Sequence, residues 1–413
     1  MEWRGYQPET DREAVHRIWR EVGWLPPKNE QADKALDAFL EGNRPIVALL
    51  NNSPECCVLS GEGSLRYQKE NIPFSAITAV TTSAIARRRG FAKRLTTQGV
   101  LRGVESGALV TGLGIFDQGF YDGLGFGALS YMYEFDFDPA SLLVNDKVRE
   151  PIRIGVDEGE PIHEARCNRL WSHGGVSLDH PCQTLSDLVW RENSYGLGYK
   201  DGPSGEISHY IWCHPEQQGE TTILRISLLV YKNREQLMEL LGLIKQQADQ
   251  VVLVNMMEPP GVQLQDLLER PFRHRNLTKG GKAANNAQAY ACFQMRMNDI
   301  PGCLEQTRLY VSNLRFNLQV TDPIAPLLAD HDGWRGVAGD YVVTLGERSN
   351  AEPGHDPQLP TLKASVNAFT RLWLGVRPAT ALSYTDDLTA SPALLMALDE
   401  TLRLPTPCTG WMF

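Results

Sequence analysis

The chain has 413 residues, of which 42% are hydrophobic, 8% aromatic and 22% charged. This composition excludes a disordered or fibrous chain, and the length favours roughly three domains over a single hydrophobic core. With 40 basic and 50 acidic residues the net charge is −10, which argues against a nucleic-acid-binding protein and favours cationic partners.

The N-terminus, the hydropathy and the cysteines predict a cytoplasmic protein without a metal. The first residues show no basic segment followed by an apolar one, so we expect no signal peptide. No apolar stretch is long enough to span a membrane, and we expect no membrane partner. The cysteines form no CxxC motif and no repeated zinc-ligand spacing, so reduced thiols are expected at positions 56, 57, 167, 182, 213, 292, 303 and 408.

The first part of the chain alternates helical and strand patterns. Apolar residues at helical spacing after Asp11 predict a helix that has Asp11 as its N-cap. Strands alternating with helices predict a mixed α/β layer fold, and the polar, proline-containing residues 136–151 predict a nearby domain boundary. The other expected elements are strands over 44–50, 55–59 and 77–82, a helix over 90–102 and a buried strand over 107–115.

The middle of the chain contains a β-α-β pattern. A strand over 222–231 is followed by Asn233, a good N-cap, and by a helix with one apolar face. A right-handed crossover should then make the strand over 251–256 parallel to the first. Residues 271–287, rich in glycine, asparagine and basic residues, predict a long loop. Beyond residue 288, strand patterns at 316–320 and 341–344 and a helical pattern at 392–402 predict an α+β module.

The most informative stretch, residues 79–93, reads Ala-Val-Thr-Thr-Ser-Ala-Ile-Ala-Arg-Arg-Arg-Gly-Phe-Ala-Lys. We expect a strand to end here, an arginine-rich turn to follow and a helix to begin at Gly90. Free N–H groups and the dipole at a helix N-terminus attract anions, and Gly90 lets the backbone approach closely. A solvated basic turn would explain the arginines alone. The Arg-x-x-Gly-x-Ala spacing between strand and helix nevertheless favours a pyrophosphate site, although it is neither a Walker loop nor GxGxxG.

A second motif, over residues 116–127, follows the expected strand at 107–115 and reads Phe-Asp-Gln-Gly-Phe-Tyr-Asp-Gly-Leu-Gly-Phe-Gly. Tyr121 is suited to donate a proton, because the pKa of a phenol, roughly 10, keeps it protonated at neutral pH. An isolated Phe-Tyr pair would more simply pack a core. The position of this pair, one strand after the arginine-rich turn and among glycines, favours a catalytic tyrosine.

Val80-x-Thr82 followed by Arg87-x-x-Gly90-x-Ala92 resembles the acyl-coenzyme A signature of the GNAT acetyltransferases. The resemblance implies that the strand end contacts the pantetheine of acetyl-coenzyme A through its backbone and that the loop amides hold the pyrophosphate. Thr82 stands where the family often has valine, a change that a backbone contact should survive. The resemblance also implies that Tyr121 is the general acid for the departing thiolate. The implied coenzyme-binding residues are Val80, Thr81, Thr82, Arg87, Arg88, Arg89, Gly90, Phe91, Ala92 and Lys93, with Phe116 and Asp117 bordering the coenzyme.

Nearly the whole chain resembles the enhanced intracellular survival (Eis) group of GNAT proteins. The resemblance implies an α/β (α+β) fold of two tandem GNAT-like domains, over residues 1–148 and 149–287, the second of them degenerate. A sterol-carrier-protein-like domain over residues 288–413 would follow, and residues 295–301 and 318–323 resemble that group's third domain. The strand-to-helix turn of the second copy, residues 231–237, has neither the glycine nor the arginine run, so this copy should not hold coenzyme A.

The sequence ends in Trp411-Met412-Phe413. An apolar terminus packed into a core would explain these residues alone. In the Eis group, however, the α-carboxylate of an aromatic terminal residue enters the first domain's site as general base, which implies that role for Phe413. Such a carboxylate would take a proton from the attacking amine. The same resemblance implies a homo-oligomer, a hexamer.

Together these motifs predict transfer of an acetyl group from acetyl-coenzyme A to an amine by direct attack. The expected acceptor is an amine-bearing small molecule, polycationic like an aminoglycoside, which the Eis resemblance implies and the net charge of −10 allows. Two alternatives stay open: acetylation of a protein lysine or N-terminal amine, and a non-catalytic acyl-coenzyme A or lipid-binding protein. No nucleic acid, membrane or metal is expected to take part.

Overall fold

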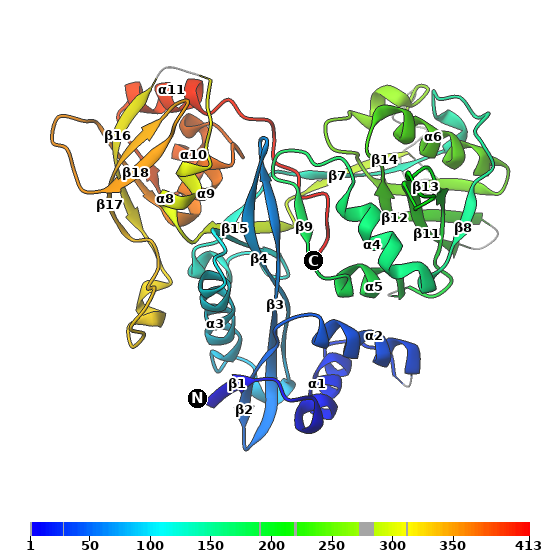
Figure 1. The fold of residues 1–413 in the computed structure, drawn as a ribbon, viewed down its shortest axis with the longest axis horizontal. Coiled ribbons are helices and arrows are strands. Elements are labelled where there is room, and N and C mark those ends of the chain that lie inside the picture. The colour runs from blue at the N-terminus through cyan, green and yellow to red at the C-terminus, as the bar shows by residue number, and fades with distance from the viewer. Residues whose placement is uncertain (1, 28, 190, 219–220, 272–284, 311–312) are drawn as a thin grey trace. The chain divides into compact units, whose positions relative to one another are not determined.

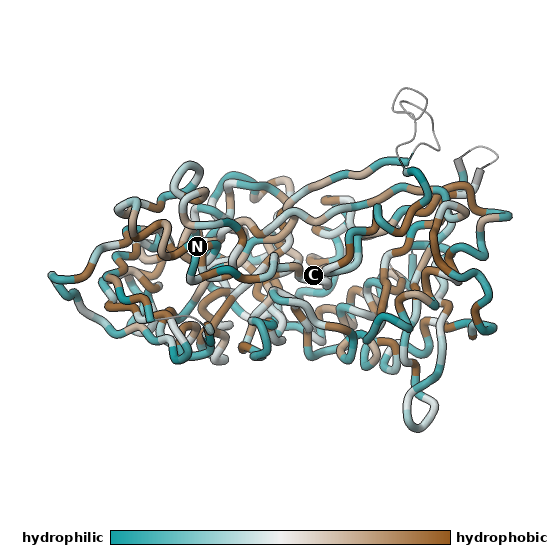
Figure 2. Tube along the Cα trace, turned by 90° about the horizontal axis from the view of Figure 1, so that it is seen from above, coloured by the Kyte–Doolittle hydropathy of each residue, from teal (hydrophilic) through white to brown (hydrophobic). Residues whose placement is uncertain are grey.

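The computed structural model (Figure 1) describes residues 2–27, 29–189, 191–218, 221–271, 285–310 and 313–413. Contacts within the chain define two compact units. The first unit comprises Met1–Ser130, Ser172–His180 and Ala291–Phe413, and the second comprises Tyr131–Trp171 and Pro181–Tyr290. Along the trace in Figure 2, hydrophobic residues come in short runs between hydrophilic ones, and none of the described helices is long and apolar enough to cross a membrane.

The first unit contains a mixed sheet with strand order β1-β2-β3-β4-β5-β15-β6, and β9 pairs with β3. Strand β15 comes from the last part of the chain and runs antiparallel to β5. Helix α3 packs beside β3 and β4 (Figure 1). The elements are β1 (Glu2–Gly5), α1 (Pro8–Glu21), α2 (Glu30–Glu41), β2 (Ile46–Leu50), β3 (Ser53–Tyr67), β4 (Glu70–Thr82), α3 (Phe91–Glu105), β5 (Val110–Gly114), β6 (Gly127–Ala128), β9 (Val176–Leu178) and β15 (Phe293–Met297).

The strands of this sheet are longer than the sequence pattern predicted. The expected strands over 55–59 and 77–82 belong to one long antiparallel hairpin, β3 and β4. Small and polar residues in the middle of β3 concealed its length. Gly63 is one of them, because a Cβ there would lie 2.2 Å from the carbonyl oxygen of Ser177 on β9. The predicted helix over 90–102 and strand over 107–115 are confirmed as α3 and β5.

The predicted N-cap at Asp11 is wrong. Helix α1 begins at Pro8 and has Gln7 as its N-cap. Asp11 lies buried in the first turn, where its carboxylate accepts a hydrogen bond from the Gln7 N–H at 2.8 Å and pairs with Arg4 at 2.6 Å. A carboxylate in the first turn stabilises the helix dipole much as a capping residue does. The residue type therefore fitted both positions.

The second unit contains a sheet with strand order β14-β7-β13-β12-β11-β10-β8. Its predicted β-α-β pattern is confirmed: Asn233 caps α6 by accepting a hydrogen bond from the Gln236 N–H at 3.0 Å, and β13 runs parallel to β12. The elements are β7 (Met132–Phe137), β8 (Ile152–Ile154), α4 (Gly159–Cys167), α5 (Cys182–Val189), β10 (Tyr195–Tyr199), β11 (His209–Gln218), β12 (Thr221–Val230), α6 (Arg234–Lys245), β13 (Val251–Met257) and β14 (Asn286–Tyr290). Most of the predicted loop over 271–287 lies outside the described residues, and its last two residues belong to β14.

The last part of the chain adds a third sheet, of strand order β18-β17-β16-β19-β20, to the first unit. It confirms the strands expected over 316–320 and 341–344 and the helix expected over 392–402. Ile324 and Leu328 pack in the same core cluster as Phe91 and Leu113, so this part and the first sheet share a core. The elements are α8 (Ile300–Glu305), β16 (Leu314–Thr321), β17 (Gly339–Leu345), β18 (Asn350–Pro353), β19 (Thr361–Ser365), α9 (Val366–Trp373), α10 (Ala379–Thr385), β20 (Leu388–Thr389) and α11 (Pro392–Thr401).

The two compact units are each built from separate stretches of the chain, and the domain boundaries expected at 148/149 and 287/288 stay a prediction. Strand β7 already pairs with β13 and β14 of the second unit. Residues Ser172–His180, expected in the second domain, return to the first unit and pair with β3 through β9. The sterol-carrier-protein-like character of the last part stays a prediction.

Candidate active site

The parallel strands β4 and β5 separate where the coenzyme motif begins. Their pairing ends at Ile77 and Leu113, while β4 continues to Thr82. At Ala79 (φ +52°) and Val80, two residues of β4 oppose one residue of β3, which makes a bulge that redirects the strand. Beyond the bulge, the edge of β4 that faced β5 is not paired with β5. An extended ligand can bind such an edge as an added strand would.

The threonine side chains at the end of β4 contact β3. The Thr81 hydroxyl donates a hydrogen bond to the Cys57 carbonyl oxygen at 3.4 Å, and the Thr82 hydroxyl lies 3.2 Å from the Cys56 sulfur. Both hydroxyls are thus used within the sheet. A ligand that lies along Val80–Thr82 would therefore meet backbone groups, which explains why valine or threonine at position 82 would serve equally.

The arginine loop, residues 83–90, brings a row of backbone N–H groups to the start of α3. Arg88 (φ +60°) and Gly90 (φ +77°) are left-handed, and Gly90 is the N-cap of α3. No described residue accepts a hydrogen bond from the N–H groups of residues 87–93. Free donors that converge at a helix N-terminus are the arrangement that binds phosphate groups.

The charges of the arginine loop are available for a ligand. Arg87, Arg88 and Arg89 are exposed, and none of them forms an ion pair within the described part of the chain. The start of the loop is fixed by Glu21 on α1, whose carboxylate accepts a hydrogen bond from the Ala84 N–H at 3.0 Å. The positive charge and the free N–H groups therefore occupy the same short segment.

Tyr121 begins the tyrosine turn, residues 121–127, which follows β5. Its carbonyl oxygen accepts a hydrogen bond from the Leu124 N–H at 2.9 Å, and the turn closes at Gly125 (φ +86°). The Tyr121 side chain is 5% exposed. Burial, together with the nearby Asp117 carboxylate, raises the pKa of Tyr121 to about 12. The phenol is therefore protonated at neutral pH, as a proton donor must be.

The predicted site segments converge on one hydrophobic cluster of the first unit. Ala86, Phe91 and Tyr121 are buried members of this cluster, and Val80 and Ala92 pack against it. A Cβ added to Gly123 of the tyrosine turn would lie 3.9 Å from the Lys93 ammonium nitrogen, so the turn also adjoins the first turn of α3. The strand end, the arginine loop and the tyrosine turn thus surround one region.

Phe116 and Asp117 lie in the exposed segment between β5 and the tyrosine turn. The ring of Phe116 is 81% exposed and meets Trp24 edge-on, with 6.2 Å between ring centroids. Trp24 lies between α1 and α2 and was not predicted as a site residue. Whether Phe116 and Asp117 border the coenzyme stays a prediction.

The tail, residues 407–413, reaches the end of β5. The Phe413 ring packs against Phe74 and Phe293, with centroid distances of 5.7 and 5.2 Å. Its terminal oxygen lies 3.0 Å from the position that a Cβ on Gly114 would occupy. Gly114 is the last residue of β5, just beyond the point where β4 and β5 separate. The small residue at this position leaves room for the carboxylate of Phe413.

Residues 172–176, here called the tail strap, hold the tail by three hydrogen bonds. The Ser172 hydroxyl donates to the Cys408 carbonyl oxygen at 3.2 Å, and the Cys408 N–H donates to the His173 carbonyl oxygen at 2.9 Å. The Val176 N–H donates to the Thr409 carbonyl oxygen at 2.9 Å. Since β9 continues from the strap and pairs with β3, the tail is tied to the first sheet.

The strap itself is anchored by His173, which is buried. Its Nδ1 accepts a hydrogen bond from the Gln68 N–H at 3.0 Å, and its Nε2 lies 3.0 Å from the Leu374 carbonyl oxygen. This pattern requires a neutral ring with its proton on Nε2. Burial lowers the pKa of His173 and favours the same form.

One group of described residues offers three ligand atoms for a metal, all within 4.8 Å: Asp201, His209 and Glu239 in the second unit. The Arg149 guanidinium pairs with both carboxylates, at 2.8 Å each, and His209 lies 3.0 Å from Glu239. A protein cation thus already balances these carboxylates. The group is explained as an ion-pair network that needs no metal.

Several residues that hold the site were not predicted from the sequence. They are the tail strap and three side chains that bond the tyrosine turn: Gln294 and Arg296 on β15 and Asn367 on α9. Arg296 falls within residues 295–301, where the resemblance signalled only a third domain. No local pattern marks the others, because each acts on a segment distant in sequence.

The chain has a GNAT fold, because it matches solved structures of GCN5-related N-acetyltransferases over its whole length. Among solved structures it is similar to Eis1 from Mycobacterium abscessus (TM-score 0.75, 18% identity) and to a GCN5-related N-acetyltransferase from Anabaena variabilis (0.76, 16%), each covering 100% of both chains. A probable N-acyltransferase from Enterococcus faecalis V583 has a TM-score of 0.76 at 15% identity, covering 100% of this chain and 99% of that one. No family model matches the chain, and no curated protein matches it in sequence.

Proposed function

We propose that the protein is an acetyl-coenzyme A-dependent N-acetyltransferase. The observation that carries the proposal is the convergence of three features: the edge at the end of β4 that is not paired with β5, the free N–H groups of residues 87–93 and the buried, protonated Tyr121. Solved neighbours described as N-acetyltransferases support it through the shared fold. Each feature serves a different part of the same donor molecule.

Acetyl-coenzyme A is the donor substrate in this proposal. Its pyrophosphate accepts hydrogen bonds from the N–H groups of residues 87–93 and is neutralised by Arg87–Arg89. Its pantetheine arm lies along the free edge of β4 at Val80–Thr82, where amide groups pair as neighbouring strands do. This orientation directs the thioester toward the region where β4 and β5 separate.

The chemistry is a direct transfer in which this chain supplies two proton-transfer groups. The α-carboxylate of Phe413 takes a proton from the acceptor ammonium, directly or through water, and the free amine attacks the thioester carbon. The C–S bond of the tetrahedral intermediate then breaks, and the thiolate takes the proton of Tyr121. The nitrogen loses its second proton to the Tyr121 phenolate, which restores the phenol. The products are the N-acetylated amine and coenzyme A. Since no covalent enzyme intermediate forms, none of the cysteines is needed as a nucleophile.

For the acceptor we propose a small polycationic amine such as an aminoglycoside. The net charge of −10 and the Asp117 carboxylate beside Tyr121 support a cationic substrate, as does the similarity to Eis1. The Eis resemblance also leads us to propose a homo-hexamer in the cytoplasm, with a sterol-carrier-protein-like last part. Light scattering of the untagged protein tests the oligomeric state.

The variant Tyr121→Phe tests the proposed role of the phenol. Loss of a positioned general acid is expected to lower kcat by roughly 100-fold or more, because such groups contribute that much. The affinity for coenzyme A, measured by calorimetry, should stay the same, since the ring still packs in the core. Tyr384→Phe, which alters a tyrosine that is 89% exposed, is the matched control. Full turnover by Tyr121→Phe would remove this tyrosine from the mechanism.

A further inference from the structure

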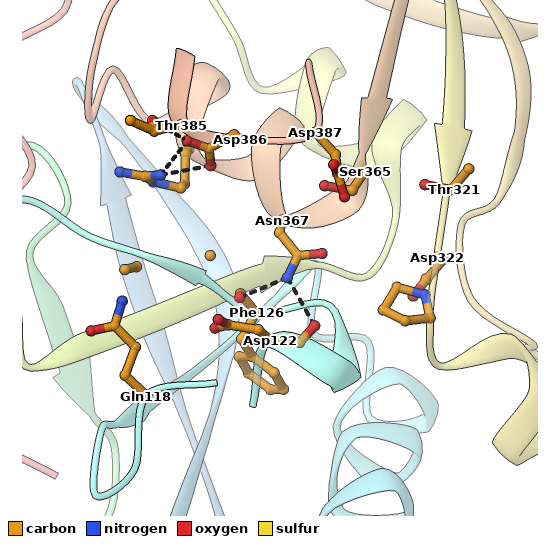
Figure 3. Close-up of a pocket in the computed structure, with 14 residues that line it drawn as sticks. Gln118, Asp122, Phe126, Thr321, Asp322, Ser365, Asn367, Thr385, Asp386 and Asp387 are labelled. Atoms are coloured by element: carbon orange, nitrogen blue, oxygen red, sulfur yellow. Dashed lines mark hydrogen bonds and ion pairs between the residues drawn. The ribbon is translucent and has the colours of Figure 1, made fainter. Parts of the chain in front are cut away.

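Side chains from β15 and α9 hold the tyrosine turn at both of its ends. The Asn367 amide donates hydrogen bonds to the carbonyl oxygens of Asp122, at 3.0 Å, and Phe126, at 2.9 Å (Figure 3). Gln294 donates to the same Phe126 oxygen at 3.3 Å and also to the Asp122 carboxylate. Both residues belong to the last part of the chain, more than a hundred positions after Tyr121.

A buried ion pair holds the middle of the turn. The Arg296 guanidinium donates to the Leu124 carbonyl oxygen and pairs with Asp322 at 2.7 Å, and the side chains of both charged residues are 0% exposed. Asp322 is fixed in turn by the N–H groups of Ile324, at 3.1 Å, and Val337, at 2.9 Å. A buried pair is retained only when its remaining hydrogen-bonding groups are satisfied. One guanidinium N–H of Arg296 is satisfied by the Leu124 carbonyl oxygen of the tyrosine turn.

The glycines of the turn allow this close contact. A Cβ on Gly125 would lie 2.7 Å from a guanidinium nitrogen of Arg296 and 2.8 Å from Val366. A Cβ on Gly127 would lie 2.5 Å from the carbonyl oxygen of Asn367. Gly125 and Gly127 of the tyrosine motif therefore allow β15 and α9 to approach the turn closely.

We propose that Asn367, together with Arg296 and Gln294, is a positioning residue that fixes the Tyr121 phenol for proton transfer. The proposal rests on the proposed function of Tyr121. In this proposal the last part of the chain contributes to catalysis by positioning Tyr121, without contacting either substrate. The turn forms backbone hydrogen bonds of its own, from the N–H groups of Leu124, Gly125 and Phe126. The side chains add bonds to the carbonyl oxygens of Asp122, Leu124 and Phe126 and so tie the turn to β15 and α9. A misplacement of about 1 Å at a reacting group lowers a rate by roughly 100-fold.

Asn367 is the member of this set that can be replaced with the least harm to folding. It lies at the wall of an open cavity of about 520 Å³ that is also lined by Asp122, Gly127, Asp386 and Asp387 (Figure 3). Water from this cavity can solvate the two carbonyl oxygens once the amide is gone. Arg296 offers no such variant, because removal of one partner leaves a buried charge.

The test compares Asn367→Ala with Asn317→Ala. Asn317 is a matched control, because its amide also donates to two carbonyl oxygens of a loop, those of Asp356 at 2.7 Å and Leu359 at 3.0 Å. We expect Asn367→Ala to lower kcat by roughly tenfold while the KM for acetyl-coenzyme A changes by less than about twofold. Asn317→Ala should leave kcat unchanged at a temperature where both variants are folded. Equal kcat values for the two variants would overturn the proposal.

Combining each variant with Tyr121→Phe separates positioning from a general structural effect. If Asn367 acts through Tyr121, then Asn367→Ala lowers kcat in the native background and not in the Tyr121→Phe background. Equal reductions in both backgrounds would overturn the positioning role. Full turnover by Tyr121→Phe alone would refute the role of Tyr121 as acid, on which the proposal rests. An impaired Tyr121→Phe together with a fully active Asn367→Ala would refute only the positioning role of Asn367.

Discussion

The role of the tail strap can be tested by adding a single methyl group. A Cβ at Gly174 (φ +77°) would lie 2.5 Å from the Pro407 Cβ, 2.8 Å from the Pro407 Cα and 3.0 Å from the Cys408 nitrogen. Carbon atoms in ordinary contact are about 3.5–4.0 Å apart, so in Gly174→Ala the tail must move by about 1 Å. The terminal carboxylate lies five residues beyond Cys408 and moves with it.

The expected magnitude follows from this displacement. A shift of about 1 Å in a catalytic group lowers kcat by roughly 100-fold, whereas binding of acetyl-coenzyme A precedes the step in which the base acts and should change little. Gly107→Ala is the matched control, because Gly107 has φ +89° and nothing within 4 Å of the added Cβ. Both variants carry the same backbone strain, about 1–2 kcal/mol in the free energy of unfolding.

The assay is the rate of coenzyme A release by untagged protein, measured with the amine of a panel that gives the fastest turnover. Urea unfolding of both variants shows that they are folded under the assay conditions. If Gly174→Ala and Gly107→Ala have the same kcat, the strap does not position a catalytic carboxylate. If only Gly174→Ala is impaired, the strap acts on the tail as the contacts indicate.

Three further predictions follow from the same geometry. Replacement of Arg87–Arg89 by alanine should weaken the binding of coenzyme A, measured by calorimetry, by roughly tenfold at low salt and by less at high salt, because salt screens exposed charges. If the variant and the native protein bind coenzyme A equally well at low salt, these arginines do not bind its phosphates. Since the pKa of Tyr121 is raised to about 12, its proton is lost only far above neutral pH, so kcat should show no alkaline decline attributable to this acid up to about pH 10; a decline near pH 8 that Tyr121→Phe abolishes would refute this. Because burial lowers the pKa of His173, the unfolded state takes up the extra proton first, and stability is lost as pH falls below the unfolded pKa of about 6.5. Urea unfolding at about pH 5.5 and about pH 7.5 should therefore show a smaller pH dependence in His173→Gln than in the native protein, and an unchanged dependence would count against it.

The parts of the site that could be predicted are those whose signal lies within a few consecutive residues. Gly90 is visible in the sequence because a left-handed N-cap after an arginine run is a local requirement. Tyr121 is visible because the glycines around it mark a turn. Both follow the end of a strand, and periodicity predicted the helix over 90–102 and the strand over 107–115 that lie between them.

The parts that could not be predicted depend on contacts between distant segments. Asn367 bonds the carbonyl oxygen of Asp122, 245 residues away, and an asparagine near a helix start has many ordinary explanations. The full length of β3 was missed because Gly63 reads as a loop residue, although its missing side chain is what allows β9 to approach. Asp11 was assigned to the wrong helix position because capping and first-turn carboxylates are chemically alike.

The central claim is that this chain moves an acetyl group from acetyl-coenzyme A to an amine, with Tyr121 as the acid. The most direct measurement is the release of coenzyme A by untagged protein in the presence of aminoglycosides, polyamines, lysine peptides and arylalkylamines, with mass spectrometry of each product. The account predicts that at least the polycationic amines are acetylated and that Tyr121→Phe lowers the rate of acetylation by roughly 100-fold or more. Coenzyme A binding without acetylation of any amine would contradict it.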